Sequence, residues 1–180
     1  MKKPLFLSLT LLATFATLLG VRAQDAETDT LVAGSYTFEF VKPWVSQTPS
    51  SSMRAGQLAH GDEEGAPVVV FFHFAGGGGG IQANLDRWIG QFEGTPDVKQ
   101  TKEEIDGTTV HFLEATGTFM ESMGGGPFSG NTKAMENYKM LAAILESDRG
   151  PVFLKLTGPD DQIAAIQEAF NALVKSPFKK

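Results

Sequence analysis

The dipeptide Asp106-Gly107 constrains the fold of this chain more than any other feature of the sequence. An Asp-Gly pair suits the two-residue turn of a β-hairpin, because both central residues of that turn adopt positive φ angles. Residues 98–105 and 108–117 flank the pair and are predicted to be the two strands. The sequence therefore predicts an antiparallel hairpin, and a sheet for that hairpin to join.

Further strands follow from the spacing of apolar residues. Tyr36, Phe38 and Phe40 alternate with polar residues, which is the period of a half-buried strand. The segment 67–74 is apolar at nearly every position and predicts a central strand that is covered on both faces. Strands are also predicted at residues 53–58, 138–146 and 152–157, the last two joined by a hairpin turn at 147–150.

Two helices complete the predicted fold. An apolar stripe at helical spacing runs from Ile81 to Phe92, and a last helix begins after Pro159. Residues 118–134 are rich in glycine and have no period, so they predict a long surface loop. The expected class is α+β, with a largely antiparallel sheet of about six strands covered by two main helices. The buried stripe of the last helix is predicted to be Ile163, Ile166, Phe170 and Leu173.

Residues 1–23 have the features of a cleavable signal peptide. Two lysines precede an apolar stretch, and small residues lead to a cleavage site near Ala23-Gln24. The alternative is an uncleaved membrane anchor, for which the stretch is short. We therefore expect a flexible leader over residues 24–34, a single α+β domain over residues 35–180, and a periplasmic or secreted protein.

Charge and composition argue against several classes of protein. The chain has a net charge of −6, and removal of residues 1–23 would leave 12 basic against 21 acidic residues, a net charge of −9. Such a surface repels phosphate groups, so we expect no nucleic acid partner and no stable membrane insertion after cleavage. The absence of cysteine excludes disulfides, zinc–thiolate sites and thiol nucleophiles. We expect no cofactor and no bound metal.

Three clusters of residues resemble an uncharacterised family of exported bacterial proteins. The clusters are Pro43-Trp44 with residues 49–54, Asn84 with Arg87-Trp88 and Gln91-Phe92, and residues 153–159. That family is similar to the PsbP-like α/β/α sandwich, the fold of the photosystem subunit PsbP, of a Ran-binding nuclear import factor and of the bacterial lipoprotein DcrB. The better understood members act mainly by binding, so the resemblance implies a binding module. No functional residue is carried over, because none of their partner-binding motifs matches this sequence.

The glycine loop, residues 76–80, lies between a predicted strand and a helix N-terminus. Backbone N–H groups and the helix dipole can hold an anion at such a place, although the loop lacks the Lys and Ser/Thr of a phosphate-binding loop. The alternative is a flexible connection. The next polar residues on one face of the helix either meet a ligand or satisfy the ends of neighbouring strands. The candidate ligand-binding residues are Gly77, Gly78, Gly79, Gly80, Asn84, Arg87 and Gln91.

Histidine and methionine residues supply further hypotheses. A hydrolase would need His73, His111 and Glu114 to converge, although no histidine pair has the spacing of a metal or catalytic motif. A metal site would recruit the same side chains with His60 or Glu103. Four methionines, at positions 120, 123, 135 and 140, invite a Cu(I) site, although the last is expected to pack in the core.

The sequence therefore favours a non-catalytic exported binding or accessory module. One alternative is a small-ligand or anion-binding protein that uses the glycine loop and Arg87, and another is a hydrolase with an unrecognised site. No Gly-x-Ser-x-Gly motif and no triad is present in the sequence, so catalysis is the less favoured interpretation. The partner, a protein or a small ligand, and the oligomeric state stay open.

Overall fold

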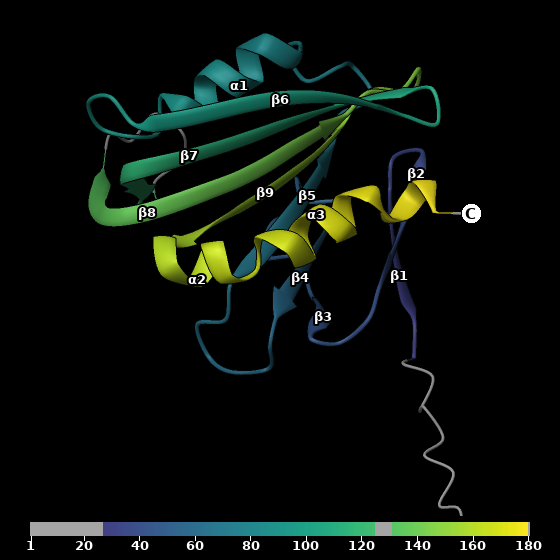
Figure 1. Ribbon diagram of the computed structural model, residues 1–180, viewed down its shortest axis with the longest axis horizontal. Coiled ribbons are helices and arrows are strands. Elements are labelled where there is room, and N and C mark those ends of the chain that lie inside the picture. The colour runs from purple at the N-terminus through teal and green to yellow at the C-terminus, as the bar shows by residue number, and fades with distance from the viewer. Residues whose placement is uncertain (1–26, 125–130, 180) are drawn as a thin grey trace, which may run out of the picture.

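The computed structural model describes residues 27–124 and 131–179. The predicted signal peptide, its cleavage site and the centre of the predicted loop at 118–134 lie outside the described residues. Over the described residues the chain forms nine strands, three α-helices and one 3-10 helix, which confirms the α+β class (Figure 1).

Seven strands form the main sheet among the described residues. In chain order they are β3 (Trp44–Gln47), β4 (Gly56–His60), β5 (Val68–His73), β6 (Asp97–Ile105), β7 (Thr108–Ser122), β8 (Thr132–Leu145) and β9 (Val152–Pro159). Their order across the sheet is β3-β4-β5-β9-β8-β7-β6, and every neighbouring pair is antiparallel. The antiparallel sheet is therefore confirmed, with one strand more than the approximate number predicted.

The two predicted hairpins of the main sheet are both present. Asp106 and Gly107 have φ angles of 50° and 78°, the positive values that the two-residue turn between β6 and β7 requires. The turn at residues 147–150 joins β8 to β9. Gly150 has a φ of 101°, and a Cβ at this position would lie 2.5 Å from the carbonyl oxygen of Phe74. Only glycine fits there without a shift of the backbone.

A small N-terminal hairpin corrects the prediction of a flexible leader over residues 24–34. Residues 29–33 form β1 (Asp29–Ala33), which pairs with β2 (Tyr36–Phe40) in a separate two-stranded sheet. Leu31 and Ala33 of β1 are buried against the main core. The strand contributes only two inward-facing apolar residues, too few to give a clear period in the sequence.

The prediction of a loop over residues 118–134 is wrong at both ends of that range, which are strand. β7 continues to Ser122 and β8 begins at Thr132, and these two residues lie opposite each other. A bulge between Gly117 and Phe119 shifts the register without ending the pair. The ladder continues because its hydrogen bonds join backbone groups, whatever the periodicity of the side chains.

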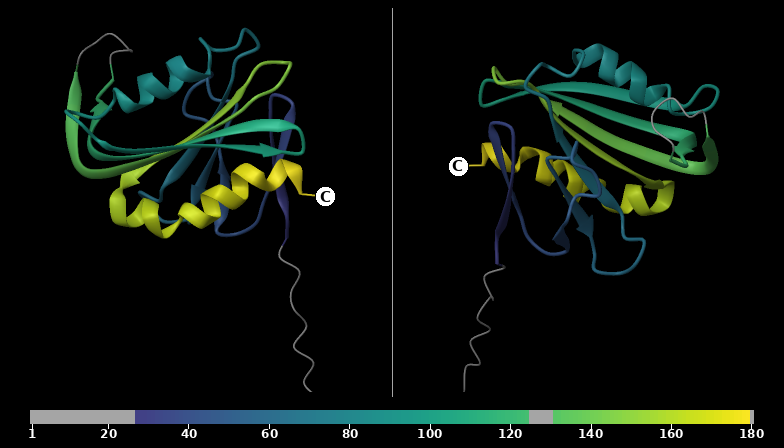
Figure 2. Two further views of the ribbon diagram at one scale, coloured as in Figure 1. Left: turned by 45° about the horizontal axis from the view of Figure 1, so that its top comes forward. Right: turned by 180° about the vertical axis from the view of Figure 1, so that it is seen from behind.

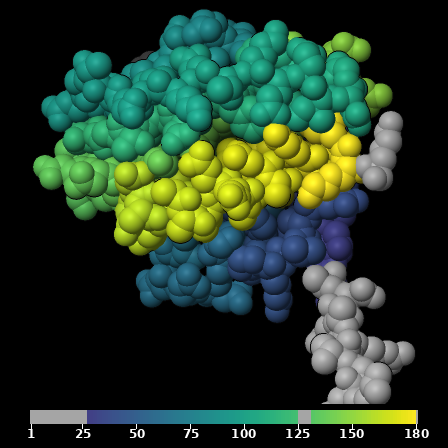
Figure 3. Space-filling model, viewed as in Figure 1, coloured from purple at the N-terminus to yellow at the C-terminus, as the bar shows by residue number. Residues whose placement is uncertain are grey.

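The C-terminal helices cover one face of the main sheet. α2 (Asp160–Ala165), α3 (Gln167–Lys175) and the 3-10 helix η1 (Ser176–Phe178) run across the molecule as one band (Figures 1 and 3). The sequence predicted a single helix, but Ile166 leaves the helical conformation with φ −111° and ψ 9°. The predicted stripe of Ile163, Ile166, Phe170 and Leu173 is buried.

The third helix, α1 (Ile81–Ile89), lies on the opposite face and covers only part of it. Leu85 and Trp88 pack with Phe92 against β7, β8 and the start of β9. Seen from behind, β4 and β5 have no helix over them (Figure 2, right). β5 was predicted to be covered on both faces, and this is wrong, because Val69 and Phe71 are fully buried whereas Val68, Val70 and Phe72 are half-exposed.

Candidate functional site

The uncovered half of the α1 face holds a pocket of about 450 Å³, which we call the open-face pocket. Its floor is formed by Val68, Val70 and Phe72 of β5 and by Lys155 and Thr157 of β9. Its size falls within the range of small-molecule sites. The arrangement places one basic side chain beside a row of three apolar side chains, in a pocket whose other lining residues are largely polar.

Lys155 is the unusual residue of this floor. It lies between Leu154 and Leu156, which are fully buried on the other face, so its own side chain projects toward α1. Its ammonium donates a hydrogen bond to Oε1 of Gln91 and lies 5.2 Å from the ring centroid of Phe119. Burial lowers the pKa of Lys155 from 10.5 to about 8, and the positive charge of Arg87 adds to this effect.

The groups that surround the Lys155 ammonium include an amide oxygen and an aromatic ring. Within the described residues, no carboxylate forms an ion pair with this ammonium. A lysine ammonium has three donors, of which Gln91 accepts one. A buried ammonium in such surroundings favours any ligand that brings an acceptor or a negative charge.

Gln91 is held in place by the backbone around it. Its carbonyl oxygen accepts a hydrogen bond of 2.8 Å from the N–H of Met120, and Glu93 donates one of 2.8 Å to the carbonyl of Thr118. The two groups of β7 that take part, the carbonyl of Thr118 and the N–H of Met120, lie within the bulge and just after it. The bulge therefore fixes the residues after α1 to the sheet and sets the side chain of Gln91 beside Lys155.

Asn84 acts on the glycine loop and not on the pocket. Its side chain is almost fully buried and donates hydrogen bonds of 2.8 and 2.6 Å to the carbonyl oxygens of Gly78 and Gly80. Its own oxygen accepts a hydrogen bond from Arg87. Asn84 thus clamps the loop onto the first turn of α1.

The four candidate glycines adopt backbone angles that other residues rarely take. Gly77, Gly78, Gly79 and Gly80 have φ angles of 84°, 60°, 92° and 85°. The N–H of Gly77 donates to the carbonyl of Phe74 at 2.9 Å, and the N–H of Gly80 to that of Gly77 at 3.3 Å. Two of the N–H groups on which the anion hypothesis depends therefore already have acceptors.

The predicted site residues thus divide into two groups. Asn84 and the glycines form a loop clamp, whereas Gln91 contacts Lys155 and Arg87 acts on it through its charge. Gln91 was expected to meet either a ligand or the ends of neighbouring strands. Its side chain instead accepts a hydrogen bond from a lysine in the middle of the sheet. Lys155 was not predicted as a site residue, although a charged residue that alternates with Leu154 and Leu156 marks a face that is not fully apolar.

The far end of the open-face pocket is lined by polar side chains of β4 and the residues before it. Arg54 donates a hydrogen bond of 2.7 Å to Oε1 of Gln57, which is itself buried. Gln57 donates one of 3.1 Å to Gln47 on β3. At the opposite end lie Tyr138 and Phe119, whose rings stack. The pocket therefore crosses four strand spacings, from β4 to β7, or about 19 Å.

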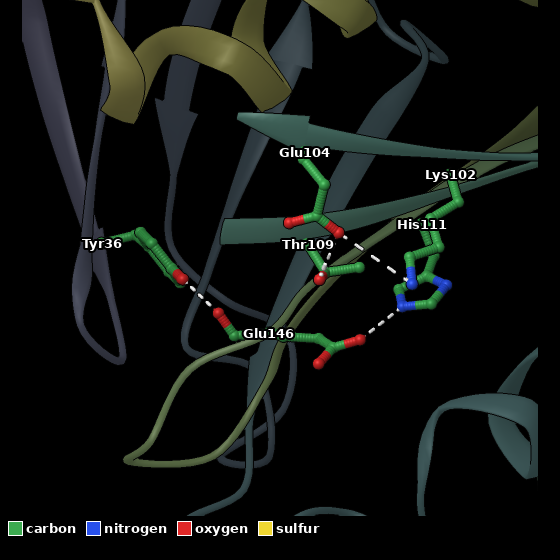
Figure 4. A network of polar contacts seen from close by, with 6 residues as sticks. All are labelled: Tyr36, Lys102, Glu104, Thr109, His111 and Glu146. Carbon is green, nitrogen blue, oxygen red and sulfur yellow. Dashed lines mark hydrogen bonds and ion pairs between the residues drawn. The ribbon is translucent and has the colours of Figure 1, made fainter. Parts of the chain in front are cut away.

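The histidines proposed for a hydrolase do not converge. His111 pairs with Glu146 at 2.6 Å, in a polar network that includes Tyr36, Glu104 and Thr109 (Figure 4). His73 lies on β5 and contacts the carbonyl of Arg149 at 3.1 Å. β9 and β8 separate β5 from β7, so the two histidines are about three strand spacings, or roughly 14 Å, apart.

Glu114, the proposed third member, faces the other side of the sheet from His111, as the parity of their positions on β7 requires. It accepts hydrogen bonds from Lys139 and from Gln167 of α3 at 3.2 and 3.1 Å. Lys139 also pairs with Asp160 at 3.1 Å. These contacts attach the C-terminal helices to the sheet, so His73, His111 and Glu114 do not form a site together.

The side chains proposed for metal binding have other surroundings. The ring of His60 lies against Trp44 with centroids 4.7 Å apart, and Glu103 pairs with Lys175 at 2.7 Å. Met140 is buried in the core as predicted, whereas Met123 is exposed at the end of the β7–β8 hairpin. In the part of the chain that the structure describes, no three His, Cys, Asp or Glu residues are placed to hold a metal ion.

The fold has counterparts among solved structures. The solution structure of cyanobacterial PsbP (CyanoP) from Synechocystis sp. PCC 6803 matches with a TM-score of 0.52 and 11% sequence identity, over 92% of this chain and 96% of that chain. The chain has a PsbP-like fold. A protein of unknown function from Pseudomonas aeruginosa matches less closely, with a TM-score of 0.43 and 13% identity, over 85% of this chain and 97% of its own.

The remaining comparisons give no further information on this PsbP-like chain. No family model matches the sequence, and no curated protein matches it. At 11% identity the similarity to CyanoP shows the fold alone. The helices in residues 27–124 and 131–179 include none that is long and apolar enough to cross a membrane.

Proposed function

We propose that this protein is a non-catalytic binding module whose binding surface is the open-face pocket. The observation that supports this most directly is the partly buried ammonium of Lys155, which no carboxylate among the described residues balances. A charge held in this way lowers stability unless a ligand compensates it. The half-exposed floor of β5 beside it supplies apolar contact area for the same ligand.

The same site gives little support to catalysis. Lys155 has an amide and an aromatic ring as its neighbours, and no described histidine lines the pocket with it. Glu121 and Tyr138 also line the pocket, but among the described residues neither makes a hydrogen bond to Lys155 that would pair them as acid and base. These features support a surface that holds a ligand, in an exported protein if the predicted signal peptide is cleaved.

A thermal-shift screen of the purified protein tests the proposal. The ligands would be divalent metals, phosphate, sulfate, nucleotides, sugars and small organic acids, because a ligand at about a hundred times its Kd stabilises by roughly 2.7 kcal/mol. We expect one class of compound to raise the Tm by several degrees. The Tm shift with that compound would then be measured again on one variant that fills the pocket and on one that leaves it unchanged.

Thr157→Phe is the variant that fills the pocket, since Thr157 lines its floor and aromatic residues are favoured in strands. Thr37→Phe, at an exposed position of β2, is its matched control. The proposal requires that the shift be lost in Thr157→Phe and kept in Thr37→Phe. A shift that survives Thr157→Phe but disappears in Arg87→Ala would assign binding to the glycine loop instead.

A further inference from the structure

We propose that the open-face pocket selects small amphipathic organic anions, with a carboxylate held by Lys155 and an apolar chain laid along the floor of β5. This inference rests on the proposed function and adds the chemical class of the ligand.

The anionic part of the inference comes from the charges around the pocket. Lys155 lies in its floor, Arg54 lines the end at β4, and Arg87 approaches Lys155 from α1. Glu121 is the one acidic side chain among the described lining residues, and it is exposed. This local excess of positive charge contrasts with a chain whose net charge is −6.

The donors of Lys155 support the same assignment. Gln91 occupies one donor, and the face of the Phe119 ring lies beside the ammonium. A carboxylate that reached the remaining donors would make charge-assisted hydrogen bonds in a partly desolvated place, where such bonds are stronger than in water. An uncharged ligand of the same shape would gain only the apolar contacts.

The amphipathic part comes from the other lining residues. Val68, Val70 and Phe72 leave half-exposed apolar side chains in a row along β5, and Tyr138 continues this surface on β8. An alkyl chain or an aromatic ring laid here would remove this surface from water, which is the main favourable term in such binding. A compact inorganic anion would leave the row uncovered.

Three eight-carbon ligands with different head groups test the inference by isothermal titration calorimetry at pH 7. Octanoate, octanol and octylamine share the apolar chain and differ in charge. We expect octanoate to bind at least about tenfold more tightly than octanol, because a hydrogen bond to a charged group is worth more than a neutral one. Octylamine should bind more weakly than either, since its charge repels Lys155 and Arg87.

Two substitutions locate the effect. The Lys155→Met variant should bind octanoate only as tightly as it binds octanol. The control Lys99→Met, at an exposed position of β6, should keep the tenfold preference for octanoate. Thr157→Phe should weaken both octanoate and octanol. The preference should also decline as the pH rises above 8, because the ammonium that binds the anion loses its proton there.

The pH dependence can be assigned to one residue. The other charged or titratable groups around the pocket are Arg54, Arg87, Glu121 and Tyr138, and they are unchanged in Lys155→Met. The decline above pH 8 should therefore be absent from that variant. In NMR spectra of lysine-labelled protein, octanoate should raise the pKa of the Lys155 ammonium.

The outcomes separate the inference from the proposed function. Equal binding of octanoate and octanol, both blocked by Thr157→Phe, would overturn the anion inference and keep the pocket as the binding surface. A preference for octanoate that persists in Lys155→Met would also overturn it. Octanoate binding that Thr157→Phe does not weaken would place the site elsewhere and count against both. An absence of heat with every ligand at millimolar concentration would reject the ligand class, and the thermal-shift screen would decide the function separately.

Discussion

Replacement of Lys155 by methionine should make the protein more stable at neutral pH. The pKa of Lys155 falls from 10.5 to about 8 on folding, mainly because burial disfavours the charged form. At about 1.4 kcal/mol for each pKa unit, the folded state carries a cost of about 3 kcal/mol for the ammonium at pH 7. Methionine has a similar length and no charge. It also removes the hydrogen bond that the charged ammonium donates to Gln91, worth about 1.5 kcal/mol, so the net gain should be about 1.5 to 2 kcal/mol.

The gain should depend on pH in a defined direction. Below pH 8 both the folded and the unfolded wild type hold the proton, and the full cost is present. Between pH 8 and 10.5 the unfolded chain binds more protons than the folded one, so the wild type becomes more stable as the pH rises. The advantage of Lys155→Met should therefore shrink across this interval.

Urea unfolding of both proteins at pH 7 and at pH 10 measures the effect. Groups common to the two proteins cancel in the difference. In a thermal melt, a gain of about 1.5 to 2 kcal/mol would raise the Tm by about 3 to 8 °C for a chain of this size. Lys99→Met, at an exposed position, should show no comparable gain. A Lys155→Met protein that is less stable than wild type at pH 7, or that keeps the same advantage at pH 10, would refute the reasoning.

Three further substitutions test other contacts. Asn84→Ala should lower the free energy of urea unfolding by about 2 to 3 kcal/mol, because the carbonyls of Gly78 and Gly80 lose their donor, and Asn84→Asp should not restore it since a carboxylate cannot donate. Gly150→Ala should lower the free energy of unfolding by at least about 1 kcal/mol more than Gly65→Ala in the same assay. Both glycines have positive φ, but only a Cβ at position 150 would lie against the carbonyl of Phe74. Lys139→Met should lower the free energy of unfolding by about 2 kcal/mol, because Glu114 and Asp160 lose a partly buried partner. Its control, Lys102→Met, removes an exposed pair and should change stability by less than about 0.5 kcal/mol.

Local chemistry made some elements predictable from the sequence. The turn at Asp106-Gly107 depends on two residues that tolerate positive φ, and the structure has both. The stripe from Ile163 to Leu173 depends on a helical period, and all of its members are buried even though Ile166 interrupts the helix. These features need information from a few neighbouring residues, which the sequence supplies directly.

Other elements depended on contacts that no local pattern contains. β1 is a strand because β2 pairs with it, and the ends of β7 and β8 are strands because each supplies the other with backbone partners. The open-face pocket exists because α1 packs over β7 and β8 and leaves β5 half-covered. The apolar segment 67–74 looks the same in the sequence whether a helix covers it or not.

The candidate site was predicted in part. Arg87 and Gln91 were chosen for their position on one helix face, and that face does approach Lys155. Asn84 was chosen for the same reason and instead clamps the glycine loop. Lys155 itself could be recognised only when the register of β9 and the limited reach of α1 were both known.

The pairing of β5 with β9 has a consequence for how the chain acquires its fold during synthesis. Val69 lies opposite Leu156, so the central ladder joins segments that are distant in the chain and cannot form until β9 has been made. Folding that waits for such non-local pairing is slow. During that interval β5 can pair with β4 on one edge only, and its other edge stays open. A sheet that cannot be completed early suits a polypeptide that must be threaded across a membrane before it folds, as a signal peptide at residues 1–23 would require.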